Sequence, residues 1–192
     1  MSAIQYIRKP EEITYDEIFD LVYAAHDGNR KQGLVINPGM RSGADFEKHL
    51  GDRSLCMVAM DGDRMVGTMS VRIEQGTRRL TKNMLTGYMM NLAVNEEYRG
   101  RGIGSELMNR LCDYAAGEGA KAAVFYVVAR NKAVKLYKEL GFIEADFLAR
   151  RTLKQNSIYM LKWLGKPGYP DWAVKLYYTV RKVYLTQRYG FQ

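Results

Sequence analysis

The sequence predicts a mixed α/β fold, in which helices flank a central, mostly antiparallel β-sheet and an extra helix ends the chain. Between residues 54 and 73 two apolar runs flank Asp61-Gly62-Asp63, and an Asp-Gly pair in this setting is a strong sign of an antiparallel hairpin. Between residues 88 and 128 an apolar run, a helical pattern and a second apolar run follow one another. This order is typical of a βαβ unit, whose two strands are parallel.

The first fifty residues predict a strand, two helices and a long loop. Residues 4–8 alternate as a strand does, and Thr14 with Glu17 three residues later forms the capping-box pattern that begins a helix. Residues 26–43 are rich in glycine and polar side chains, which predicts a loop of a length that is often functional. A short helix is predicted over residues 45–50.

The second half of the chain predicts alternating helices and strands. Apolar residues recur at helical spacing over 103–116, and Gly117 is expected to end that helix. Residues 122–128 form a continuous apolar run, as in a buried strand. A further helix is predicted over 132–140 and a last strand over 158–164.

The composition is that of a globular protein. Its 192 residues, 47% of them hydrophobic, suffice for one domain with a sizeable core. Apolar runs are far shorter than the roughly 20 residues that span a bilayer, and the first nine residues lack a secretion signal, so we expect a cytoplasmic protein. Cys56 and Cys112 lie among apolar residues and predict buried thiols, with neither a disulfide framework nor a metal site.

The net charge of +8 is concentrated at the C-terminal end. Residues 1–146 hold 20 Lys and Arg against 20 Asp and Glu, whereas residues 147–192 hold nine bases and one acid, Asp171. We therefore predict a neutral domain over residues 1–164 and a basic, amphipathic helical extension over residues 165–192, after a linker rich in glycine and proline.

The predicted C-terminal helix has a marked apolar face. Asp171 is its expected N-cap, one face carries Trp172, Leu176, Val180, Val183 and Tyr184, and the opposite face carries Lys175, Thr179 and Lys182. Such a helix docks on its own domain or on a second copy in a homodimer, or it lies on an anionic membrane surface. Nucleic acid is a weaker alternative, because no recognised module is present.

The strongest sign of chemistry is the glycine-rich turn Arg99-Gly100-Arg101-Gly102-Ile103-Gly104-Ser105, between a predicted strand and a predicted helix. Glycines let backbone amides approach a ligand closely, and the free amides at a helix N-terminus attract anions. A P-loop would need a lysine after the last glycine, and a dinucleotide fingerprint would need G-x-G-x-x-G with a later acid. Neither pattern fits, so the turn predicts a different phosphate-bearing ligand.

Two motifs resemble those of the GNAT acetyltransferase superfamily. The segment Leu92-Ala93-Val94, followed by Glu97-Tyr98 and the glycine-rich turn, is similar to the acetyl-CoA motif R/Q-x-x-G-x-G/A. Asn131, Ala133, Leu136-Tyr137, Leu140 and Gly141-Phe142 are similar to the second motif, N-x-x-A-x-x-L-Y-x-x-x-G-F. The resemblance covers roughly residues 1–164, and it implies a GNAT fold in which the strand before the turn splays from its parallel neighbour.

The resemblance implies acetyl-CoA as the co-substrate, with no metal. Leu92, Ala93 and Val94 would contact its acetyl group and pantetheine arm, and a backbone N–H, that of Leu92, would polarise the thioester carbonyl. The pyrophosphate would be held by Gly100, Arg101, Gly102, Ile103, Gly104 and Ser105, with Arg99 at its edge. Asn131 would be a further contact, although the second motif is one residue short, which leaves Arg130 as the alternative there.

Tyr137 matches the family tyrosine that protonates the departing thiolate. A phenol keeps its proton near neutrality and is able to donate it as charge develops on sulfur. The alternative is a tyrosine that packs in the core. No general base is evident, since Glu74, Tyr88, His26 and Asp27 are candidates by residue type alone and an amine can also lose its proton through water.

The resulting hypothesis is an acetyl-CoA-dependent N-acetyltransferase, an acyltransferase that acts on a primary amine of a small molecule or protein. The amine would attack the thioester directly in a ternary complex, after entering beside residues 26–43 and 74–88. Two alternatives are a CoA-binding GNAT-like module without transfer activity and an O-acetyl or longer-acyl transferase.

Overall fold

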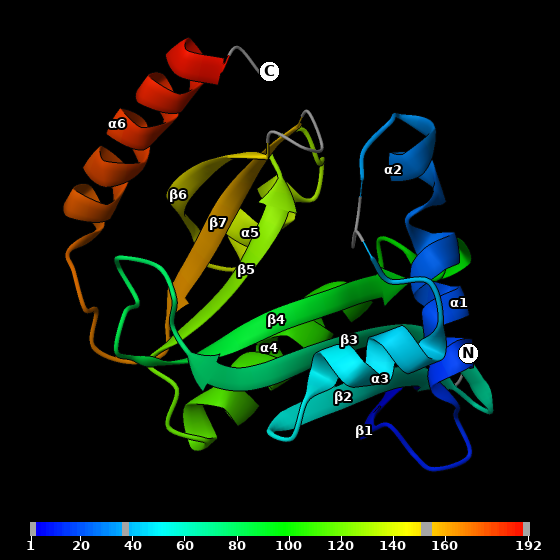
Figure 1. Cartoon of the computed structure of the whole chain (residues 1–192). Coiled ribbons are helices and arrows are strands. Elements are labelled where there is room, and N and C mark those ends of the chain that lie inside the picture. Colours follow the sequence, from blue (N-terminus) through cyan, green and yellow to red (C-terminus); the bar gives the residue numbers. More distant parts are fainter. Residues whose placement is uncertain (1–2, 36–38, 151–154, 190–192) are drawn as a thin grey trace.

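The computed structural model describes residues 3–35, 39–150 and 155–189. Its strands are β1 (Gln5–Arg8), β2 (Ser54–Asp61), β3 (Arg64–Gln75), β4 (Leu85–Val94), β5 (Ala122–Val128), β6 (Ile143–Arg150) and β7 (Gln155–Trp163). They form one sheet in the order β1-β2-β3-β4-β5-β7-β6, in which β4 and β5 are parallel and the other described neighbours are antiparallel (Figure 1). The predicted mixed, mostly antiparallel sheet is therefore confirmed.

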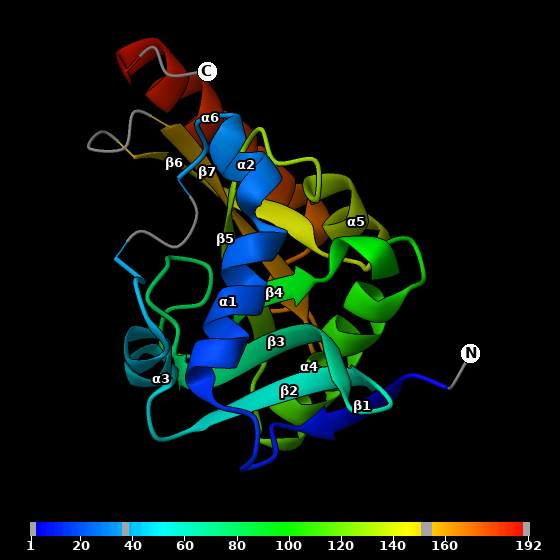
Figure 2. The same ribbon diagram turned by 90° about the vertical axis from the view of Figure 1, so that its right-hand side faces the viewer.

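Helices cover both faces of the sheet. They are α1 (Tyr15–Ala25), α2 (Asp27–Lys31), α3 (Gly43–Leu50), α4 (Ile103–Gly117), α5 (Val134–Glu139) and α6 (Asp171–Tyr189). Figure 2 shows α3 and α4 on opposite sides of the sheet. Ile18 of α1 and Phe46 of α3 are fully buried against one face, and Leu107 and Leu111 of α4 are fully buried against the other.

Local signals in the sequence determine where several elements begin and turn. Thr14 accepts a hydrogen bond from the backbone N–H of Glu17, whose carboxylate accepts one from the Thr14 N–H, so the predicted capping box is confirmed. The predicted hairpin joins β2 to β3, with Gly62 and Asp63 as its central residues because Asp61 pairs with Arg64. Gly62 has a φ of 59°, which a glycine adopts without steric cost.

The sequence pattern missed a short helix and an edge strand. Residues 27–31 form the short helix α2 inside the predicted loop, and residues 143–150 form β6, which completes the sheet at one edge. A register shift between Glu144 and Asp146 interrupts the alternation of β6, which hides the strand in the sequence pattern. Cys56 and Cys112 are both buried free thiols, as expected.

Helix α6 packs on the edge strand β6, but through a different face from the one the apolar pattern suggested. Val174, Tyr178 and Leu185 are buried, and the Tyr178 ring packs edge-on to Phe147 of β6 with 6.2 Å between centroids. Arg181 pairs with the buried Asp146 at 3.1 Å. The helix starts at Asp171 itself, so this residue lies in the first turn and is not the N-cap.

No helix of residues 3–35, 39–150 and 155–189 is both long and apolar enough to cross a membrane.

Helix α4 packs closely on the sheet at Gly87, which predicts a stability effect. A Cβ added at Gly87 would lie 2.7 Å from the Ala115 Cβ and 3.2 Å from Val71 Cγ2. We expect Gly87→Ala to lower the free energy of unfolding by about 1–3 kcal/mol, because the added methyl group pushes α4 away from the sheet. Urea unfolding followed by circular dichroism measures the change.

Gly117→Ala in the same helix is the matched control. A Cβ at Gly117 meets nothing within 4 Å, so this change is expected to leave the stability unchanged or to raise it. Equal free energies of unfolding for Gly87→Ala and the wild type would contradict the packing argument.

Candidate active site

The two parallel strands separate after a short contact. Just three pairs join them, Thr86 with Ala122, Gly87 with Ala123 and Tyr88 with Val124. Residues 89–94 of β4 have no described pair on β5, although β4 stays paired to β3 as far as Val94. Figure 1 shows β4 and β5 diverging from this point. The sheet is therefore splayed beside the glycine-rich turn, as the predicted fold requires.

A β-bulge lies in the splayed part of β4. Thr68 of β3 pairs with Ala93 and Ser70 with Met90, so Met69 faces two residues, Asn91 and Leu92. Asn91 has a φ of 59°, a left-handed conformation that asparagine tolerates better than most residues. A bulge takes backbone groups out of the regular ladder and redirects them. The Leu92 peptide predicted to polarise a thioester belongs to this bulge.

A cavity of about 320 Å³ passes through the splay. Met108 of α4 and Tyr137 of α5 line it on one side of the sheet, and His26, Met40 and Tyr126 line it on the other. The cavity thus connects the two faces of the sheet. Two ligands that enter from opposite faces are able to meet inside it.

Tyr137 lines the cavity on the α4–α5 side. Its ring packs edge-on to Phe125 of β5, with 4.6 Å between centroids. Burial raises the pKa of Tyr137 to about 12. Burial disfavours the phenolate, so the hydroxyl keeps its proton across the neutral range and is suited to donate rather than to accept.

The glycine-rich turn forms the N-terminus of α4, as predicted. Gly100 and Gly102 have φ values of 75° and 79°, and a Cβ at either would project into open space. Gly102 is the N-cap of α4, so the amides of the first helical turn that follows have no partner within the helix. The turn is thus an open, positively polarised cradle that fits a phosphate or pyrophosphate.

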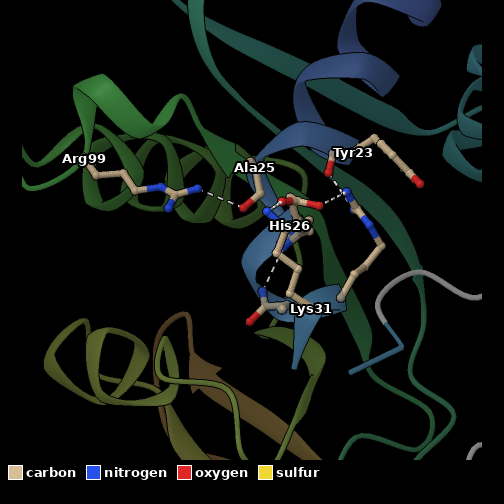
Figure 3. Close-up of polar contacts among 8 residues, drawn as sticks. Tyr23, Ala25, His26, Lys31 and Arg99 are labelled. Atoms are coloured by element: carbon tan, nitrogen blue, oxygen red, sulfur yellow. Dashed lines mark hydrogen bonds and ion pairs between the residues drawn. The ribbon is translucent and has the colours of Figure 1, made fainter. Parts of the chain in front are cut away.

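The two arginines of the turn make contacts of their own. Arg99 donates to the carbonyls of Ala25 at 2.8 Å and Val94 at 3.3 Å, as Figure 3 shows for Ala25. Arg101 donates to the Glu97 carbonyl at 2.9 Å. Arg99 therefore holds the C-terminal end of α1 against the turn, and its contact with a pyrophosphate stays a prediction.

The other predicted cofactor residues divide into three groups. Leu92 and Asn131 line the cavity, and the Asn131 side chain accepts a hydrogen bond from the Ala133 N–H at 2.9 Å. The side chains of Ala93 and Ile103 are buried in the core, so they offer a ligand their backbone alone. Val94, Gly104 and Ser105 lie outside the cavity lining, beside the open end of the splay.

Two of the four candidate bases lie away from the cavity lining. Asp27 pairs with Lys31 at 2.7 Å and Glu74 pairs with Arg72 at 2.7 Å, so both carboxylates have cationic partners. His26 and Tyr88 line the cavity. His26 Nδ1 lies 3.2 Å from Asn29 Nδ2 at the end of α1 (Figure 3). The imidazole also bonds to the Leu92 backbone. His26 thereby connects the end of α1 to the bulge.

Two contacts near the cavity were not foreseen in the sequence. Arg78, from the β3–β4 connection, donates to the Tyr126 hydroxyl at 2.5 Å. Gln155 of β7 both donates to and accepts from the backbone of Val35, at 2.9 and 3.1 Å. The partners are far apart in the chain, and no local pattern marks such pairs. The contacts hold the β3–β4 connection and Val35 beside the cavity.

His26 is expected to make stability depend on pH. Burial lowers the pKa of His26, and the positive charges of Arg30 and Arg99 lower it further. As the pH falls below about 6.5 the unfolded chain takes up the proton first, so stability is lost as the pH falls. We expect the free energy of unfolding to decrease between about pH 7.5 and 5.5, measured by urea unfolding at each pH.

The chain has two histidines, which supplies the control for this measurement. His26→Gln is expected to flatten the pH dependence, and His49→Gln is expected to preserve it. A slope that survives in the first variant and disappears in the second would contradict the assignment.

The splayed sheet, the bulged strand and the glycine-rich helix N-terminus together define a GNAT-type acyltransferase. The model of the acetyltransferase (GNAT) family matches residues 16–142. The chain therefore belongs to the GNAT acetyltransferase family, as its motifs predicted.

Relatives and solved structures agree with this class. The chain is 36% identical over 119 residues to the N-alpha-acetyltransferase MAK3 of Arabidopsis thaliana, which covers 61% of this chain and 60% of that protein. It is 30% identical over 124 residues to an N-alpha-acetyltransferase of Sulfurisphaera tokodaii, covering 60% of this chain and 73% of that one. The chain thus spans less than two thirds of the Arabidopsis relative.

Among solved structures, a chain of the NatC complex bound to Gag peptide and CoA is similar in fold. The TM-score is 0.65 at 20% identity, and the match covers 85% of this chain and all of that one. At this identity the likeness establishes the fold.

Proposed function

We propose that the protein is an acetyl-CoA-dependent N-acetyltransferase that acetylates the α-amino group of a peptide or protein. The observation that carries the proposal is the cavity between the splayed strands β4 and β5, which is lined by residues from both faces of the sheet. One face offers the glycine-rich cradle to a CoA thioester, and the other offers an acceptor site. The cytoplasm is the proposed location.

The cradle at the start of α4 suits the pyrophosphate of CoA. Open space beside Gly100 and Gly102 leaves their backbone accessible, and the amides of the first helical turn would bond the phosphate oxygens. Asn131 would contact the pantetheine arm inside the cavity. Leu92, Ala93 and Val94 would guide that arm along the edge of β4 that faces β5, where residues 89–94 have no described pair on β5.

The proposed reaction is direct transfer. The neutral acceptor amine forms a bond to the carbonyl carbon of the thioester, and the carbon–sulfur bond then breaks. The Leu92 N–H would stabilise the negative charge that develops on the carbonyl oxygen. Tyr137 would give its proton to the departing sulfur, and the proton lost by the amine would leave through water.

The α-amino acceptor is proposed from the relatives, which are named N-alpha-acetyltransferases. The acceptor side of the cavity is consistent with an extended peptide end. Met40 and Met90 offer adaptable apolar surface there, and the rings of Tyr88 and Tyr126 lie 6.2 Å apart. Arg78 holds Tyr126 in place through its hydroxyl.

A peptide library tests the proposal. Peptides that vary at their first two residues are incubated with acetyl-CoA, and CoA release is measured together with the mass of the product. The same peptides with a blocked N-terminus are the control. Their α-amino group cannot react, so any acetylation of the blocked peptides falls on a lysine side chain. We expect acetylation of free α-amino groups with a preference at the first residues.

Other outcomes separate the alternatives. Acetylation of blocked peptides or of small amines at an equal rate would overturn the α-amino proposal while keeping the transferase. Tight acetyl-CoA binding with no CoA release for any amine would favour a CoA-binding module without transfer activity. A clear preference for longer acyl-CoA thioesters or hydroxyl acceptors would favour the third hypothesis.

A further inference from the structure

Helix α6 carries a second apolar face that the domain does not cover. Its inner face packs on β6 through Val174, Tyr178 and Leu185. Its outer face presents five large apolar side chains that are between 49% and 70% exposed, namely Trp172, Leu176, Val180, Val183 and Tyr184. At 1.5 Å per residue they form a stripe about 18 Å long. Scattered apolar residues on a surface are ordinary, but a continuous stripe marks a contact site.

Basic residues border this stripe on both sides. At 100° per residue, Lys175 and Lys182 lie along one border and Arg188 lies along the other. None of these three makes an ion pair with a described acid, whereas Arg181 at the inner face is neutralised by Asp146. The one acid of α6 is Asp171, at its first residue. The outer surface is therefore apolar in the middle and positive at its edges.

The basic border extends beyond the helix. Arg79 of the β3–β4 connection lies over the ring of Tyr177, with 5.9 Å from its guanidinium carbon to the ring centroid. This contact places a further positive charge beside α6, supplied by a distant part of the chain. The charges and the stripe thus belong to one composite surface.

We propose that the outer face of α6 docks on the surface of an anionic lipid bilayer. Tryptophan and tyrosine favour the boundary between headgroups and acyl chains, and Leu176 with the valines would enter the acyl region. The bordering lysines and arginines would reach back to anionic headgroups. A second copy fits this surface less well, because two such faces would bring bases against bases with no acid from Trp172 to Tyr189 to offset them.

The position of α6 leaves the cavity accessible. The helix stands beyond β6 at one edge of the sheet, on the far side from α1 and α3 (Figure 1). No described residue of α6 lines the cavity between β4 and β5. Docking through α6 would hold the protein at a membrane while a peptide still reaches the acceptor side, so the two activities are separable.

Vesicle co-sedimentation of the full chain tests the proposal. Vesicles of phosphatidylcholine with about one third phosphatidylglycerol are expected to bind the protein, and vesicles of phosphatidylcholine alone are expected to bind it much less. Lys175→Glu with Lys182→Glu should weaken binding by about fivefold or more for each lysine changed, and high salt should do the same. Leu176→Ser with Val180→Ser should weaken binding at least about tenfold.

The control variant is Ile7→Ser, which changes another exposed aliphatic side chain, on β1. It should bind vesicles as the wild type does, and circular dichroism should show all variants folded. The rate of CoA release with a soluble acceptor should be the same in the α6 variants as in the wild type. This measurement does not depend on the lipid result.

Three outcomes would overturn the proposal. The first is no difference between anionic and neutral vesicles. The second is vesicle binding that survives in both α6 double variants. The third is a stable dimer in light scattering that Leu176→Ser with Val180→Ser converts to a monomer without any loss of vesicle binding, which would assign the face to a second copy.

Discussion

The Tyr137→Phe protein is expected to lose about two orders of magnitude in kcat, while its affinity for acetyl-CoA stays within about twofold of the wild type. The substitution removes the hydroxyl and retains the ring that packs edge-on to Phe125. The fold and the cavity wall therefore survive, and the donor toward the departing sulfur is lost. Steady-state kinetics with a saturating acceptor and calorimetric titration of acetyl-CoA measure the two quantities separately.

The pH profile is a second measurement on the same group. Because the pKa of Tyr137 is raised to about 12, its proton stays in place throughout the neutral and mildly alkaline range. The wild type should therefore show no fall in kcat from this group below about pH 10.

Tyr114→Phe is the matched control, since this partly buried tyrosine of α4 packs against the same core but does not line the cavity. We expect its kcat to equal that of the wild type. If Tyr137→Phe also keeps the wild-type kcat, Tyr137 is a packing residue and another group protonates the thiolate.

Local patterns predicted most of the fold because they reflect local physics. The capping box at Thr14 and the hairpin at Gly62 depend on residues within four positions of one another. The parallel pairing of β4 with β5 follows from chain connectivity through α4. Edge strand β6 escaped prediction because its register shift interrupts the alternation and its buried Asp146 reads as a surface residue.

The site was predicted less completely than the fold. The glycine-rich turn is continuous in the sequence, so its place at the start of α4 was foreseeable. The bulge at Asn91 arises from how β3 and β4 fit together, and the bond from Arg78 to Tyr126 joins residues 48 positions apart. Such features depend on tertiary packing. The same holds for α6, where both faces carry apolar residues and packing alone decides which one is buried.

Gly104→Val is expected to weaken acetyl-CoA binding by about two orders of magnitude with little change in stability. A Cβ at Gly104 would lie 3.7 Å from Val94 Cγ2 and 3.8 Å from Leu92 Cδ1, which is ordinary contact, so the fold accepts a side chain there. The branched methyl groups would occupy the approach between the first turn of α4 and the splayed strand β4. One or two lost charge-assisted bonds to phosphate, together about 3 kcal/mol, account for the expected loss.

Gly117→Val, at the other end of α4, is the control, because a side chain there meets open space. Calorimetric titration should show wild-type affinity in this variant and a weakened affinity in Gly104→Val, with both folded by circular dichroism. An intermediate loss in Gly104→Ala would show that the added volume causes the effect. Unchanged affinity in Gly104→Val would place the pyrophosphate away from the start of α4, because a ligand held by those amides cannot share the space with a valine.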